Sequence, residues 1–155
     1  LRAAQSIFQN YSATFDYLIE KYFNSKMEKF AKQKGLEYHY QKSEDSHVRF
    51  YLTNPIWEGK CWIGFTYEAN RYHYGLCNNF NNYRLPDESR KILHERLKNL
   101  GVGSRKESNW WPFFAYSSNL TIDVWENDII KSDNFINECK EKIEKILTAM
   151  EEVKL

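Results

Sequence analysis

The first third of the chain carries hydrophobic residues at alternating intervals of three and four, between residues 3 and 34. This spacing lines one face of a helix, so the sequence predicts a long amphipathic N-terminal helix that Gly35 ends. Ser25 and Glu28 have the spacing of a capping box, which leaves open a break at Asn24 and a second helix after it. The periodic positions are Ala4, Phe8, Tyr11, Phe15, Leu18 and Tyr22.

From Leu36 to Asn78 the hydrophobic period changes to two, which is typical of strands. The longest alternating pair of runs would form a hairpin if Ala69-Asn70 lies at its tip. That register sets Ile63 opposite Leu76, Phe65 opposite Tyr74 and Tyr67 opposite Tyr72 on one face, which we expect to be the core face.

On the other face of this hairpin the same register places Gly64 opposite Gly75. Because glycine has no side chain, the pair is expected to leave a bare window of backbone that another molecule can approach closely. Trp62 and His73 lie on this face beside the window.

The second half of the chain begins and ends with helical patterns. A helix is predicted from Pro86 to about Asn99, with acidic residues in its first turn and Gly101 just beyond it, and another from Asp133 onward. The aromatic-rich stretch 101–119 is predicted to be a loop, and 120–125 a last strand or short connector. The class is α+β: an antiparallel sheet of about four strands, with the three helices packed on one face.

Composition limits the size and setting of the molecule. The 155 residues suit one domain over 1–155, and 10 Phe, 5 Trp and 11 Tyr support a sizeable core. No apolar run approaches the ~20 residues of a membrane-spanning helix, so we expect a soluble protein without a membrane partner. The start at Leu1 suggests the C-terminal fragment of a longer chain, and three scattered cysteines favour the reducing cytoplasm.

Charge is distributed unevenly although the net charge is only +1. Residues 84–106 hold seven basic and three acidic residues, and Arg105-Lys106 is followed closely by Trp110-Trp111. Cations beside stacking surfaces suit single-stranded or distorted nucleic acid, whereas the low net charge predicts weak duplex binding. The alternative interpretation is a solvated helix face next to core tryptophans.

Catalytic and metal-binding patterns are weak. His73 and Cys77 share a strand face but would lie ~13 Å apart, too far for one zinc ion. Asp45 followed by Glu58-Gly59-Lys60 has the order of a magnesium nuclease motif, yet Pro55 and Gly59 predict a turn there and not a rigid strand. We therefore expect no catalytic residues, no metal and no cofactor in this chain.

The segments Trp62-Ile63-Gly64-Phe65-Thr66-Tyr67-Glu68 and Tyr72-His73-Tyr74-Gly75-Leu76, with Trp110-Trp111-Pro112 and the last helix, resemble the C-terminal region of uncharacterised bacterial PD-(D/E)XK nuclease superfamily proteins. The resemblance covers about residues 45–150. In that family the nuclease core precedes this region, so the resemblance implies an accessory domain of a magnesium-dependent nuclease and gives no catalytic residue here.

The leading hypothesis is a non-catalytic domain that binds DNA or a protein partner. Two alternatives stay open: an interaction or homo-oligomerisation module that uses the N-terminal helix, and a small-ligand pocket near Tyr72, Tyr74 or Trp62. The expected binding residues are Trp62, Gly64, Gly75, His73, Arg105, Lys106, Trp110 and Trp111.

Overall fold

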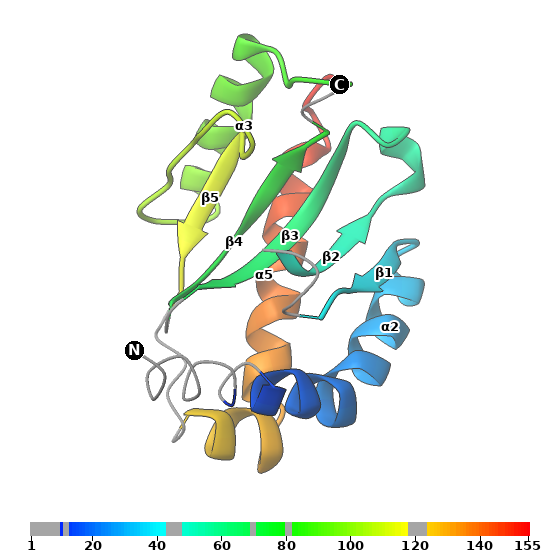
Figure 1. Cartoon of the computed structure of the whole chain (residues 1–155). Helices are drawn as coiled ribbons and strands as arrows, with labels where there is room; N and C mark the ends of the chain where they lie inside the picture. The colour runs from blue at the N-terminus through cyan, green and yellow to red at the C-terminus, as the bar shows by residue number, and fades with distance from the viewer. Residues whose placement is uncertain (1–9, 11–12, 43–47, 69–70, 80–81, 118–123) are drawn as a thin grey trace, which may run out of the picture.

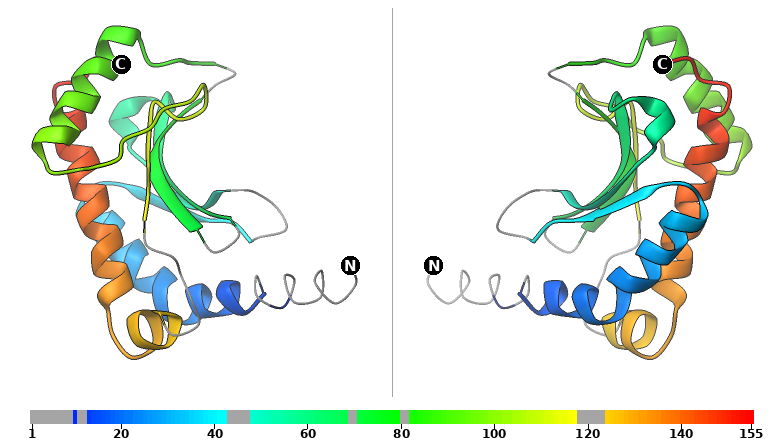
Figure 2. Two further views of the ribbon diagram at one scale, coloured as in Figure 1. Left: turned by 90° about the vertical axis from the view of Figure 1, so that its left-hand side faces the viewer. Right: turned by 90° about the vertical axis from the view of Figure 1, so that its right-hand side faces the viewer.

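A computed structural model describes residues 10, 13–42, 48–68, 71–79, 82–117 and 124–155. It consists of one five-stranded antiparallel sheet, in the order β1-β2-β3-β4-β5, with helices gathered on one of its faces (Figures 1 and 2). The strands are β1 (Glu37–Tyr40), β2 (Val48–Thr53), β3 (Cys61–Glu68), β4 (Arg71–Asn78) and β5 (Phe113–Tyr116). The helical elements are η1 (Ile19–Phe23), α2 (Asn24–Gln33), η2 (Pro55–Trp57), α3 (Asp87–Asn99), η3 (Trp125–Ile130) and α5 (Asn134–Met150).

The α+β class and the placement of the helices confirm the sequence prediction, with five strands in place of about four. The additional strand, β5, lies in the stretch 101–119 that was predicted to be a loop. Its four residues pair with β4 through His73–Leu76. A strand this short has little alternation of its own, so its pairing with a neighbour decides its conformation.

The register predicted for the β3–β4 hairpin is confirmed over its whole length. Ile63 lies opposite Leu76, Phe65 opposite Tyr74 and Gly64 opposite Gly75. The predicted tip, Ala69-Asn70, lies outside the described residues. Because side chains alternate between faces, this register divides the whole sheet into two faces of different composition.

The covered face is the face that packs against the helices. Two rows of directly opposed residues cross it and are mostly buried, and α5 supplies the facing surface. Burial of each large apolar side chain contributes about 1.5–3 kcal/mol, so this interface is the main source of stability. The rows are Tyr38-Leu52-Ile63-Leu76-Phe113 and Tyr40-Phe50-Phe65-Tyr74-Ala115, and the buried α5 residues are Phe135, Ile136, Cys139, Ile143, Ile146, Ala149 and Met150.

The N-terminal helix runs through residues 13–33 and includes the π-helical turn η1. No side-chain hydrogen bond caps the start of α2, so the capping box at Ser25 and Glu28 does not form. The wider π-helical turn of η1 leads directly into α2, so the helix continues without a break. Ile19, Phe23 and Met27 are buried along it. Gly35, with φ +71°, ends the helix as predicted.

The C-terminal part agrees with the predicted helices. α3 begins at Asp87, and α5 covers the segment predicted from Asp133 onward. The predicted strand or connector 120–125 lies largely outside the described residues, but its last two residues, Val124 and Trp125, are helical and lead into η3. None of the helices in the described ranges is both long enough and apolar enough to span a bilayer.

Candidate binding surface on the open face of the sheet

The open face of the sheet carries a row of aromatic side chains. One line of directly opposed residues crosses all five strands here: His39, Tyr51, Gly64, Gly75 and Phe114. Residues opposite each other on neighbouring strands point to the same side, so this line defines the face. With their neighbours on this face they form the aromatic row: His39, Tyr51, Trp62, His73, Trp111, Phe114 and Tyr116.

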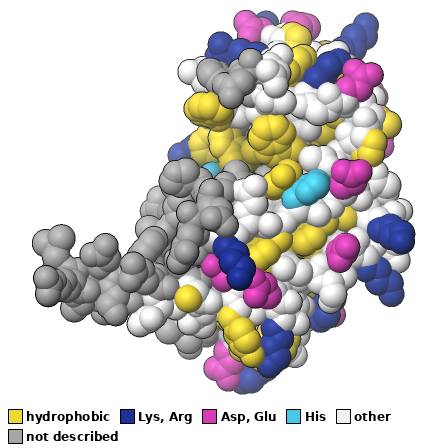
Figure 3. Space-filling model, turned by 45° about the vertical axis from the view of Figure 1, so that its right-hand side comes forward, with side chains coloured by type: hydrophobic (Ala, Val, Ile, Leu, Met, Phe, Trp, Pro, Cys, Tyr) yellow, Lys and Arg dark blue, Asp and Glu magenta, His cyan; other side chains and the backbone are white. Residues whose placement is uncertain are grey.

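No described helix lies over the aromatic row, and Figure 3 shows hydrophobic side chains gathered across this side of the molecule. Six of its members are half-buried, and Tyr116 is 45% exposed. Rings that are partly open to water on a sheet face are suited to stacking against a ligand.

At the β1–β3 end the row is held by ring contacts. The rings of His39 and Tyr51 are stacked with centroids 4.6 Å apart, and Trp62 lies 6.2 Å from Tyr51. His39 is oriented further by Thr53, whose Oγ1 lies 3.2 Å from Nε2. Glu37 lies beside this end, with a carboxylate oxygen 3.9 Å from the same nitrogen.

At the β4–β5 end the rings meet edge to face. The His73 ring lies 5.1 Å from Trp111, 5.6 Å from Phe114 and 5.7 Å from Tyr116. The ammonium of Lys106 lies 5.0 Å from the centre of the Tyr116 ring. One end of the row is therefore basic and the other acidic, while its centre is uncharged.

The predicted glycine window is not bare. A Cβ atom built on Gly64 would lie 3.0 Å from the Trp111 ring and 2.8 Å from Sγ of Cys77. Trp111 thus packs where the missing side chain would stand and joins the two ends of the row. The prediction of a naked backbone surface was wrong, because a nearby tryptophan buries that apolar surface itself.

Gly75 has a different role. A Cβ atom there would lie 2.0 Å from the carbonyl oxygen of Phe113, which no real structure tolerates. The glycine lets β5 approach β4 closely and so holds Phe114 and Tyr116 on the open face. It supports the surface and does not offer a ligand contact of its own.

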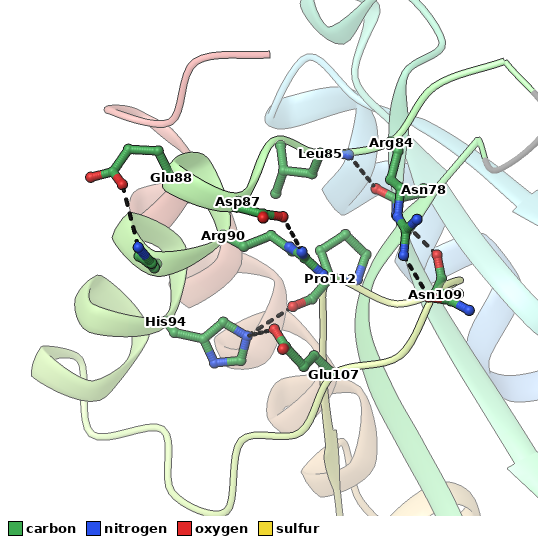
Figure 4. A network of polar contacts seen from close by, with 11 residues as sticks. Asn78, Arg84, Leu85, Asp87, Glu88, Arg90, His94, Glu107, Asn109 and Pro112 are labelled. Carbon is green, nitrogen blue, oxygen red and sulfur yellow. Dashed lines mark hydrogen bonds and ion pairs between the residues drawn. The ribbon is translucent and has the colours of Figure 1, made fainter.

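The basic segment 84–106 is mostly engaged in contacts within the protein. Figure 4 shows Arg84 hydrogen-bonded to the Asn109 side chain, Arg90 paired with Asp87, and His94 between Glu107 and the Pro112 carbonyl. Arg96 pairs with Glu152. These cations pair with carboxylates or donate to side-chain amide and backbone oxygens, so they add little to a phosphate-binding surface.

The expected binding residues therefore divide into two groups. Trp62, His73 and Trp111 come together in the aromatic row, and Lys106 lies at its end. The Arg105 guanidinium instead donates to the carbonyl of Val102. Trp110 is 56% exposed, and its carbonyl accepts a hydrogen bond from the backbone of Asn78.

Four members of the row were missed by the sequence interpretation: His39, Tyr51, Phe114 and Tyr116. A signal existed for Tyr51, because it alternates with Phe50 and Leu52 on a predicted strand. Phe114 and Tyr116 could not be assigned to a face while their segment was predicted to be a loop.

The described residues offer no centre for metal chemistry. Glu58 has φ +51° and lies in the turn after η2, as the sequence predicted, and its carboxylate is 3.5 Å from Nζ of Lys60. Asp45 lies outside the described residues. Within the described ranges no three His, Cys, Asp or Glu side chains are grouped so that they could hold an ion.

Comparison of the chain with protein-family models, with curated proteins and with solved structures found no match.

Proposed function

We propose that this chain is a non-catalytic binding domain of a PD-(D/E)XK nuclease-like protein, and that its aromatic row binds single-stranded or distorted DNA. The observation that carries the proposal is the row itself, which crosses all five strands on the face that no described helix covers. The nuclease context comes from the resemblance in residues 45–150.

Stacking is the interaction that such a row favours. Unpaired bases stack on aromatic side chains with about 1–3 kcal/mol each, and every base has a face that can do so. A duplex keeps its bases stacked inside and presents phosphates, which need cations. Since the row is uncharged at its centre and Lys106 lies only at one end, single strands are the better ligand.

The test is a fluorescence-anisotropy titration with a labelled single-stranded oligonucleotide and the matching duplex. Tyr51→Ala removes a ring from the β1–β3 end of the row and is expected to weaken single-strand binding by about tenfold. Tyr17→Ala is the matched control, because Tyr17 is 54% exposed on the N-terminal helix, outside the row. Equal losses in the two variants, or a preference for the duplex, would contradict the proposal.

The absence of catalysis is tested separately. The purified chain is expected to leave single-stranded and duplex DNA intact in the presence of Mg²⁺, as judged by gel electrophoresis. Cleavage that Glu58→Ala abolishes would show that the non-catalytic part of the proposal is wrong, whatever the binding result.

Protein interaction through the N-terminal helix is the second candidate. Tyr17 is 54% exposed on this helix, while residues 1–9 and 11–12 lie outside the described part of the chain. The hypothesis predicts a dimer whose mass in light scattering falls on dilution. A monomer at all concentrations would exclude it and leave the DNA proposal unaffected.

We also place the protein in the cytoplasm. Cys61, Cys77 and Cys139 are all free thiols and all buried, which suits a reducing compartment.

A further inference from the structure

On the covered side of the sheet, four polar side chains form a closed network between β4, β5 and α5. Glu138 Oε1 accepts hydrogen bonds from Tyr72 Oη at 2.9 Å and from Ser117 Oγ at 2.6 Å. Lys142 Nζ donates to the same two hydroxyl groups, at 2.6 Å each, and to Glu138. Each of the three lysine protons therefore has an acceptor.

This network does not make Ser117 a nucleophile. A serine beside a lysine can be activated only if the lysine is neutral and can accept its proton. Here the ammonium of Lys142 is paired with the Glu138 carboxylate, and Ser117 accepts from it. The network is a structural connection that fixes one wall of an adjacent hollow.

The hollow has a volume of about 310 Å³, at the lower end of the range for small-molecule sites. It lies between α5, the loop after α3 and the edge strand β5. Its polar lining includes Tyr74, Ser104, Tyr116, Glu138, Glu141, Lys142 and Lys145.

Among the residues that line the hollow, Tyr74 gives the strongest indication of ligand binding. Tyr74 is only 7% exposed, and its hydroxyl makes no hydrogen bond with the described residues. The hydroxyl is not itself enclosed by protein, and Tyr74 lines the hollow, so the group is available to a ligand there. Burial, with the carboxylates of Glu138 and Glu141, raises the pKa of Tyr74 to about 12, so the group is a neutral donor at physiological pH.

The charges around the hollow balance. Glu138 is paired with Lys142, and Glu141 with Lys145 at 2.7 Å, each one helical turn apart on α5. An anionic or cationic ligand would have to break one of these pairs. A neutral ligand with several hydroxyl groups can both donate to the carboxylates and accept from Tyr74 or Lys145 without disturbing them.

We propose that this hollow binds a small polyhydroxylated molecule, such as a monosaccharide or polyol, with the Tyr74 hydroxyl as a hydrogen-bond donor to it. Tyr74 and α5 place the site on the covered side of the sheet, and of the aromatic row Tyr116 alone also lines the hollow. Millimolar affinity is expected, since few hydrogen bonds are available.

The test is a titration of ¹⁵N-labelled protein with D-glucose, D-ribose and glycerol, followed by amide chemical shifts. At least one of these is expected to shift the amides of the hollow's lining at up to about 50 mM. Tyr74→Phe should weaken that binding about 2- to 10-fold by removing a single hydroxyl. Tyr17→Phe is the matched control and should bind as wild type does.

Sodium phosphate and methylammonium chloride serve as the ionic probes. Stronger shifts with either of these, no shift with any of the three polyols, or undiminished binding by Tyr74→Phe would each overturn the proposal. The melting temperature gives a second readout, because a hydroxyl without a protein partner contributes nothing to the fold. Tyr74→Phe should therefore melt at the wild-type temperature or above it, whereas a structural hydroxyl would lower it.

Discussion

The two faces of this sheet are built from alternate residues of the same strands but have different surroundings. On β3, Ile63 and Phe65 are 0% and 1% exposed beneath the helices, whereas Trp62 between Cys61 and Ile63 is half-buried on the open face. The covered face buries most of its side chains and supplies stability. The open face keeps rings in contact mainly with one another, so it can bind a ligand at small cost to the fold.

Gly64 and Gly75 lie opposite each other on β3 and β4 but make room for different neighbours. Gly64 makes room for a side chain, the Trp111 ring, while Gly75 makes room for the backbone of β5. A side chain can rotate away from an added methyl group, but a paired strand cannot. The open face is therefore rigid at β4–β5 and adaptable above β3.

The largest expected effect comes from truncating one residue on each face of β3. Phe65→Ala should lower the free energy of unfolding by about 3–5 kcal/mol, because it leaves a cavity under α5. Trp62→Ala should cost about 1 kcal/mol, since it removes half-buried cross-strand contacts and a hydrogen bond with Cys77 but opens no cavity in the core. Urea unfolding followed by circular dichroism measures both, and equal losses would show that the two faces do not differ as described.

The next largest effect is a difference in stability loss between alanine substitutions at Gly75 and Gly64. Gly75→Ala is expected to destabilise by about 3 kcal/mol, and Gly64→Ala by about 1–2 kcal/mol, because only the first forces backbone apart. Gly103→Ala is the control, since nothing lies within 4 Å of its added Cβ. A larger loss for Gly64 than for Gly75 would reverse the assignment of rigid and adaptable regions.

A smaller effect tests whether Trp111 seals the open face. Burial raises the pKa of Cys77, and raises that of Cys61 to about 12, so both thiols should react slowly with DTNB in the native protein. Trp111→Ala should speed modification of Cys77 by about tenfold or more and leave Cys61 protected on the covered face. Trp110→Ala is the neighbouring control, and the same acceleration there would mean general loosening.

The smallest effect concerns the polar network behind the sheet. Burial alone would raise the pKa of Glu138, but hydrogen bonds from Lys142, Ser117 and Tyr72 outweigh it and lower the pKa below 4.5. A lowered folded pKa means that the stabilisation is present above about pH 4.5 and is lost as pH falls through the folded value. The stability difference between wild type and Glu138→Gln should thus be constant near neutral pH and shrink below about pH 4.5. A difference that does not vary with pH in urea unfolding would contradict this assignment.

The local periodicity of hydrophobic residues was sufficient to predict much of the fold. The helices α3 and α5 and the complete β3–β4 register follow from the spacing of hydrophobic residues, because both periodicities are properties of the backbone. Two of the seven members of the aromatic row could be anticipated in the same way, since Trp62 and His73 lie on the face opposite the predicted core.

Contacts between distant segments could not be predicted. The position of β5 depends on its pairing with β4, and the Trp111 ring reaches Gly64 only through that pairing. Two cations of 84–106 looked available for phosphate because their partners lie far along the chain: Asn109 for Arg84 and Glu152 for Arg96. Tyr72 likewise meets Glu138 and Lys142 across 66 and 70 residues.

The amino-acid sequence by itself determined which residues face the core and which face outward on β3, β4 and the helices, since backbone geometry repeats every two or every 3.6 residues. Only the tertiary structure decided that the outward-facing rings join into one row and that a charge-balanced hollow forms behind it. Both depend on contacts between side chains that are distant in the sequence, and local periodicity carries no information about such contacts.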